Sequence, residues 1–158
     1  MTNEILYDIS IYLKEKQFNV SYKPKNENTL FNELTVSLNK EFEGKTFKWN
    51  LQILHVTERQ DFFEKNKLLQ FFVPLSVIQN KEITTSLISF LNTVNSKMIL
   101  GHFGFLENDN LLYFKYNAII SLDFNINSFE LLVDQVNTIS LQLLMYKSAF
   151  DGVLVADK

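Results

Sequence analysis

Strict alternation of apolar and polar residues between positions 34 and 55 is the feature that most limits what this chain can fold into. Leu34, Val36 and Leu38 alternate with polar residues, and a second run repeats the pattern over positions 47–55. A period of two is typical of strands that bury one face of a sheet. Because Glu43-Gly44-Lys45 between the two runs is a turn signal, the pattern predicts a β-hairpin.

The rest of the chain divides between further strands and amphipathic helices. We expect strands over 18–22, 69–77, 99–106 and 111–122. The run 69–77 is continuously apolar, which predicts a strand buried on both faces. Apolar residues at helical spacing predict helices from Ile5 to Leu13, from Ile83 to Met98, and from about Asn127 onward.

This order of elements indicates an α+β fold in one domain, residues 1–158. Strands joined by short turns favour a mainly antiparallel sheet, with an N-terminal helix, a middle helix and a C-terminal helix packed on it. A chain of 158 residues is an ordinary size for a single domain, whereas two domains of half that length would each bury little core.

Composition excludes several kinds of chemistry and partner. The chain has no Cys, so it has no disulfide, thiolate nucleophile or thiolate zinc site. Arg59 is the only arginine among 15 basic residues and the net charge is −3, which argues against binding to nucleic acid or an anionic membrane. No secretory signal and no apolar run long enough to span a bilayer is visible, so we expect a cytoplasmic protein.

No motif points to catalysis, and we expect neither a metal nor a cofactor. His55 and His102 each lack a second ligand at metal-site spacing, so both are interpreted as structural. Asp123 opens a pattern resembling a calcium loop, but Ser128 replaces the required glycine and Asp134 the required glutamate. An unrecognised enzyme would need a solvated pocket around Asp123 or His102.

The last helix carries more apolar residues than one buried stripe requires. Leu141, Leu144 and Met145 fall outside the main stripe, so the C-terminal half is apolar nearly all round. Such a helix is either enclosed within its own domain or covered by a partner. We interpret these three residues as a partner-binding surface or a homodimer interface.

Three segments together resemble a known family. They are Leu91-Asn92-Thr-Val-Asn95, then Gly101-His-Phe-Gly104-Phe105, then the strand Leu111–Tyr116 after an acidic turn. A helix, strand, turn and strand carrying these residues resemble the YbjN family, whose domains share the fold of type III secretion chaperones. The similarity is clearest over residues 83–146.

The resemblance implies a helix–sheet–helix domain that commonly pairs and binds other proteins without catalysis. In secretion chaperones, apolar sheet patches and grooves hold an extended segment of a client. The family has no fixed catalytic residues to carry over. Asn92 and Asn95 match its motif, and we expect their side chains to tie down the turn after the helix.

The sequence therefore predicts a non-catalytic protein-binding module, chaperone- or adaptor-like and regulatory, that forms a homodimer. The alternative is a small-molecule-sensing regulatory domain. Its pocket would be lined by the aromatic residues Phe103, Phe105, Phe114 and Tyr116.

Overall fold

A computed structural model describes residues 4–27, 31–56, 66–78, 84–121 and 126–156. These residues form three helices and six strands, which confirms the predicted α+β class and the order of its elements. They are α1 (Glu4–Glu15), β1 (Asn19–Lys23), β2 (Glu33–Phe42), β3 (Lys45–His55), β4 (Asn66–Val77), α2 (Thr84–Asn95), β5 (His102–Leu106), β6 (Leu111–Ser121) and α3 (Ile126–Ala156).

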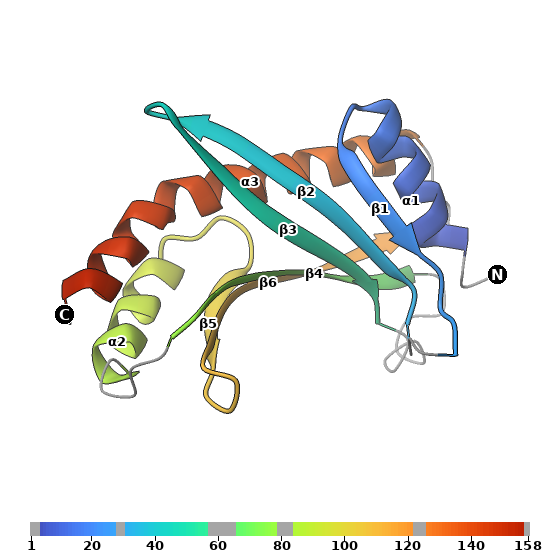
Figure 1. Cartoon of the computed structure of the whole chain (residues 1–158). Helices are drawn as coiled ribbons and strands as arrows, with labels where there is room; N and C mark the ends of the chain where they lie inside the picture. Colours follow the sequence, from blue (N-terminus) through green and yellow to red (C-terminus); the bar gives the residue numbers. More distant parts are fainter. Residues whose placement is uncertain (1–3, 28–30, 57–65, 79–83, 122–125, 157–158) are drawn as a thin grey trace.

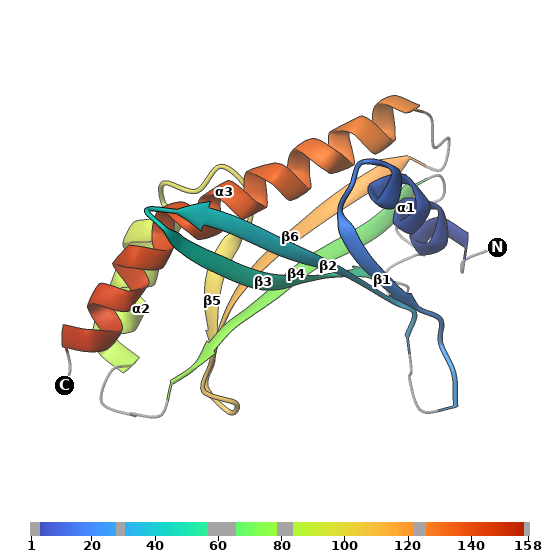
Figure 2. The same cartoon turned by 45° about the horizontal axis from the view of Figure 1, so that its top comes forward.

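The strands form one antiparallel sheet in the order β1-β2-β3-β4-β6-β5. The 31-residue helix α3 crosses this sheet from the end that carries α1 to the end that carries α2 (Figures 1 and 2). Helices α1 and α3 pack on one face, which we call the inner face, while α2 packs against β5 and α3. The other face, here called the outer face, lies open in the part of the chain described.

The β2–β3 hairpin forms as its alternation predicts. Leu34, Val36 and Leu38 are buried on the inner face, and their neighbours along β2 point outward. The strands close at the pair Phe42↔Lys45, and both turn residues, Glu43 and Gly44, have positive φ. A two-residue turn with positive φ at both residues has a backbone twist that matches the twist of the two strands it joins.

Strands β3 and β4 are paired at one end of the sheet and separate at the other end. Strands β3 and β4 pair only from Gln52↔Phe72 to His55↔Leu69, although each strand is much longer. Figure 1 shows the β2–β3 hairpin diverging there from β4 and β6. A small cavity of about 80 Å³ lies in this region, with Trp49 and Phe150 in its wall. The C-terminal half of α3 therefore packs where the strands no longer meet.

Aromatic contacts fix both ends of α3. Near its start, the ring of Phe129 lies 4.7 Å from that of Tyr12 in α1. Near its end, Phe150 contacts Phe90 of α2 at 5.2 Å and Phe103 of β5 at 4.7 Å, measured between ring centroids. Between these ends α3 buries a stripe against the sheet, namely Leu132, Val136, Ile139 and Leu143.

The prediction that both faces of 69–77 are buried is wrong. Leu69, Phe71 and Val73 of β4 are fully buried on the inner face. On the outer face, however, Phe72 is only half-buried and Val77 is 65% exposed. The helices cover one face of the sheet, and no described segment covers the other, so the outward apolar residues of β4 stay accessible.

The strand expected over 99–106 begins later, at His102. Gly101 has a φ of 64°, and a Cβ there would lie 2.5 Å from the carbonyl oxygen of Lys115, so only glycine fits. Helix α2 also ends earlier than expected, at Asn95, which leaves Met98 in the loop between α2 and β5. Ile83, at the expected start of that helix, lies outside the described residues.

A buried glutamine holds the loop before β5. Gln142 of α3 is 3% exposed, and its Oε1 accepts hydrogen bonds from the backbone N–H groups of Ile99 and Leu100, at 2.8 and 3.0 Å. Its Nε2 donates to the carbonyl oxygen of Leu100 at 3.0 Å. One side chain thus satisfies three backbone groups where the chain leaves helical and strand geometry.

We predict that Gln142→Leu lowers the free energy of unfolding by about 3 kcal/mol, because it leaves those backbone groups without partners. The matched control is Gln135→Leu on the same helix. Gln135 makes one long bond of 3.4 Å to the Tyr116 hydroxyl, and its Oε1 is buried without a partner. Its replacement should cost under about 1 kcal/mol. Urea unfolding followed by Trp49 fluorescence measures both, and equal losses would contradict the role of Gln142.

Candidate functional site

The structure brings two of the three predicted interface residues to the surface of α3. Leu141 is 54% exposed and Met145 is 70% exposed, and they lie one turn apart on the same face of the helix. Leu144 is half-buried and packs against the core, so it is not part of this surface. Ile99, in the loop before β5, is 80% exposed, and its backbone N–H bonds to Gln142 of the same helix. We call Ile99, Leu141 and Met145 the α3 patch.

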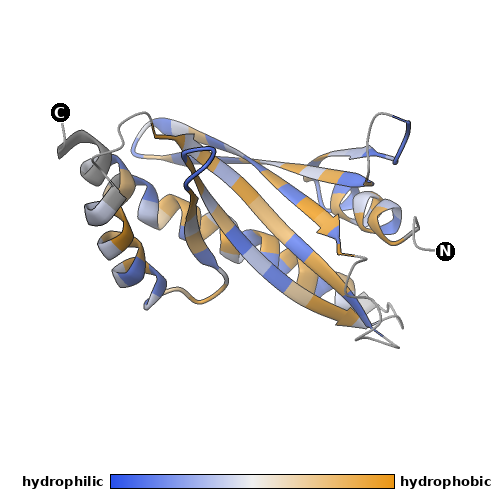
Figure 3. Ribbon diagram, turned by 90° about the horizontal axis from the view of Figure 1, so that it is seen from below, coloured by the Kyte–Doolittle hydropathy of each residue, from blue (hydrophilic) through white to orange (hydrophobic). Residues whose placement is uncertain are grey.

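The outer face of the sheet carries a second apolar surface at its α2 end. Cross-strand pairs place Pro74 beside Tyr113, and Leu111 between Val77 and Leu106. In Figure 3 apolar and polar bands alternate along the strands. The outer sheet patch is defined as Phe72, Pro74, Val77, Leu106, Leu111 and Tyr113.

Aromatic contacts make the middle of the outer sheet patch flat. A Cβ on Gly104 would collide with the ring of Tyr113, its cross-strand partner, so this ring lies directly over the glycine. The same ring stacks on Phe72 with 5.3 Å between centroids and meets His102 edge-on at 6.4 Å. Glycine at position 104 therefore lets an aromatic side chain lie along the sheet.

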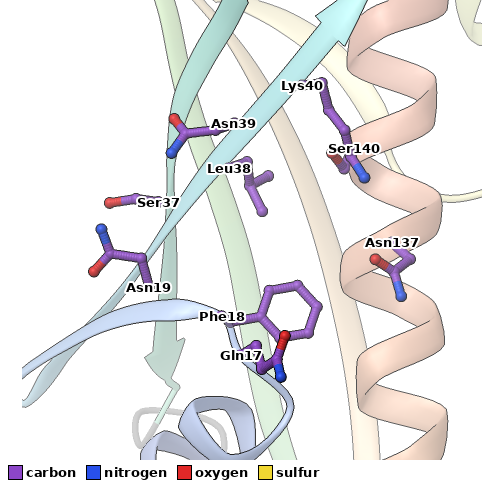
Figure 4. Close-up of a pocket in the computed structure, with 9 residues that line it drawn as sticks. All are labelled: Gln17, Phe18, Asn19, Ser37, Leu38, Asn39, Lys40, Asn137 and Ser140. Carbon is purple, nitrogen blue, oxygen red and sulfur yellow. The ribbon is translucent and has the colours of Figure 1, made fainter.

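A polar pocket of about 200 Å³ opens between the turn after α1, strands β1 and β2, and helix α3 (Figure 4). Phe18 and Leu38 give it apolar walls, and the Lys40 side chain extends from β2 toward α3, as Figure 4 shows. On α3, Asn137 and Ser140 face the same space. Its remaining lining residues are all uncharged and polar, namely Gln17, Asn19, Ser37 and Asn39.

Asn95 closes the free edge of β5. Its Nδ2 donates to the carbonyl oxygen of Phe103, and the N–H of Phe103 donates to its Oδ1, both at 2.8 Å. At this residue the amide side chain makes the two hydrogen bonds that a neighbouring strand would make. The Asn95 side chain was expected to tie down the turn after α2, and it ties down the strand β5 instead. Asn92, the other residue of the motif, is exposed on α2.

The residues considered for catalysis do not converge. His55 lies half-buried at the end of β3, whereas His102 is exposed on the outer face of β5. Within the described ranges no three His, Asp or Glu side chains group as metal ligands would. Asp123, with the start of the calcium-like pattern, lies outside those ranges. None of the helices in the described part of the chain combines the length and apolarity needed to cross a bilayer.

The aromatic residues expected to line a sensing pocket are instead part of the core. Phe103 and Phe114 are buried, and Phe105 and Tyr116 pack against the buried cluster. Phe103 does border the cavity of about 80 Å³, but that volume corresponds to fewer than three liquid waters.

The sequence did not reveal the polar pocket, because the walls of this pocket come from separate elements. The available signal was Asn137 and Ser140, two polar residues one turn apart on an apolar helix.

We predict that Asn95→Ala lowers the free energy of unfolding by about 2 kcal/mol, because both backbone groups of Phe103 lose their partner. Asn92→Ala, three residues earlier on the same helix, should change it by under about 0.5 kcal/mol, since the side chain is exposed. Hydrogen exchange of the Phe103 amide reports the effect locally. Unchanged protection of that amide in Asn95→Ala would contradict the edge-closing role.

A scan against models of protein families matches none of them, and a search of curated proteins also returns no match. The resemblance to the YbjN family therefore stays a prediction.

Proposed function

We propose that this chain is a non-catalytic protein-binding module, chaperone- or adaptor-like, that holds an extended apolar segment of another protein on its outer sheet patch. The observation that carries the proposal is the apolar outer face of β4, β5 and β6. An antiparallel sheet with one solvated face normally presents polar residues there. Here Val77 and Leu106 are exposed beside half-buried Phe72, Leu111 and Tyr113.

The energetics of this surface favour a bound segment. Complete burial of a Val, Leu or Phe side chain contributes about 1.5–3 kcal/mol relative to exposure. Several such side chains on one flat surface offset the entropic cost of ordering a short peptide. Around them Lys115, Asn117 and His102 supply polar groups on the same face, which can orient the backbone of the segment.

The closed edge of β5 supports binding across the face. A segment that joined the sheet as an additional strand beside β5 would need the backbone groups of Phe103. Asn95 already occupies both groups. The proposed client therefore lies over the side chains of the patch and does not extend the sheet at this edge.

The test is an affinity capture from lysate of the source organism with three matched baits. Val77→Lys should abolish capture of a partner found near one-to-one with the wild type, because it places a charge within an apolar contact. Phe42→Lys makes the same charge change at an exposed apolar residue on the distant hairpin, and should retain the partner. A partner retained by Val77→Lys, or the absence of any partner, would contradict the proposal.

A second copy of the chain is the proposed partner of the α3 patch. An exposed cluster of apolar residues on a helix marks a protein contact. Leu141 and Met145 are exposed one turn apart on the helix that spans the whole sheet, and the exposed Ile99 lies in the loop that is bonded to Gln142 of the same helix. A twofold contact would bury the same residues from both copies.

We predict that the wild type sediments at twice the 18.5 kDa chain mass and that the double variant Leu141→Lys/Met145→Lys is a monomer. Loss of about 1.5 kcal/mol at each of two side chains in both copies, about 6 kcal/mol in all, raises the dissociation constant on the order of 10⁴-fold. Leu131→Lys, at an exposed residue nearer the start of α3, is the control and should stay dimeric. Leu144→Lys is unsuitable because that side chain packs on the core. A monomeric wild type would refute self-pairing.

A further inference from the structure

The polar pocket between α1, β2 and α3 holds three polar groups without partners. Ser140 is 1% exposed, and its Oγ is buried with no hydrogen-bond partner in the described structure. Lys40 and Asn137 are half-buried residues, and their side chains make no ion pair or hydrogen bond with the described residues. A buried hydroxyl without a partner, as at Ser140, costs stability unless something else bonds to it. All three face one cavity, so a single ligand can satisfy them together.

The charge of the lining limits the ligand to a small anion. Lys40 is the only charged residue among the lining residues, and no Asp or Glu lies with it. A phosphate carries close to two negative charges at neutral pH and usually meets arginine forks or several backbone amides. One lysine beside an amide and a hydroxyl suits a carboxylate with a single charge.

The shape and remaining polarity of the pocket define the rest of the molecule. A volume of about 200 Å³ equals roughly seven liquid waters, which admits only a short carbon skeleton. The Phe18 ring and Leu38 can contact its carbon atoms, while the amide of Gln17 suits a hydroxyl group. The side chains of Asn19, Ser37 and Asn39 point away from α3 in Figure 4, so these residues border the pocket through their backbone.

Gln17 at the edge of this pocket occupies a position that favours glycine. The N–H of Phe18 donates to the Leu13 carbonyl and that of Gln17 to the Lys14 carbonyl, which is the Schellman arrangement at the end of α1. Gln17 has a φ of 66°, a conformation that costs a residue with a Cβ about 1 kcal/mol. A polar side chain is thus present at the pocket where glycine would give a more stable turn.

We infer that this pocket binds a short hydroxylated monocarboxylate, whose carboxylate is held by Lys40, Asn137 and Ser140. The inference is independent of the outer sheet patch and of the α3 patch. It gives the regulatory role a specific ligand class and places the ligand where α1, the sheet and α3 meet.

The test is titration of the ¹⁵N-labelled full chain with D-glycerate, with glycerol as its uncharged counterpart and inorganic phosphate as the alternative anion. Glycerate should bind saturably with a dissociation constant of about 1 mM or below. The amide signals of Phe18, Asn39 and Asn137 should shift, whereas glycerol and phosphate should leave them unchanged. No saturation by glycerate, or equal shifts with glycerol or tighter binding of phosphate, would overturn the inference.

Three variants separate binding from folding. Lys40→Gln should weaken glycerate at least about tenfold, while Lys48→Gln, an exposed lysine on the outward side of β3, should not. Ser140→Ala should also weaken glycerate without lowering the midpoint of thermal unfolding, because the hydroxyl has no partner to lose in the free protein. Loss of stability with unchanged affinity in Ser140→Ala, or unchanged affinity in Lys40→Gln, would overturn the assigned carboxylate site.

Discussion

The packing of α3 against the inner face of the sheet is the interaction on which the rest of this structure depends. The helix is roughly 46 Å long at 1.5 Å per residue. It reaches α1 through the ring of Phe129 and reaches α2 and β5 through Phe150. Because β3 and β4 pair over only a few residues, the sheet alone does not fix the hairpin relative to β4, β6 and β5. That arrangement is maintained through their shared contact with α3.

The features that the sequence predicted are those set by neighbours along the chain. Alternation at Leu34, Val36 and Leu38 is decided by which face of a single strand is buried, and Glu43-Gly44 closes the hairpin locally. Helical spacing located all three helices for the same reason. The spacing of apolar residues along a strand does not show whether another part of the chain covers the second face of the sheet. The apolar run of β4 therefore predicted two buried faces where the structure has one.

The candidate sites depend on contacts between distant parts of the chain. In α3, Ser140 and Gln142 are buried while Leu141 and Met145 are exposed, the reverse of what polarity alone suggests. Gln142 is buried because its partners, Ile99 and Leu100, arrive from the loop before β5. Lys40 and Ser140 meet only after β2 and α3 have packed. No local pattern contains this information. The sequence therefore did not show that Leu144 packs on the core while Leu141 and Met145 are exposed, and it did not reveal the pocket.

The amide of Asn95 has a consequence for the behaviour of many copies together. Exposed strand edges let identical chains join edge to edge and grow into fibrils. At β5 the backbone groups of Phe103 are not available for such growth, because the Asn95 side chain of the same molecule already bonds to both of them. A protein with an apolar sheet surface is at particular risk of such polymerisation. By occupying Phe103, Asn95 makes this edge a poorer template for edge-to-edge pairing beside the apolar outer face.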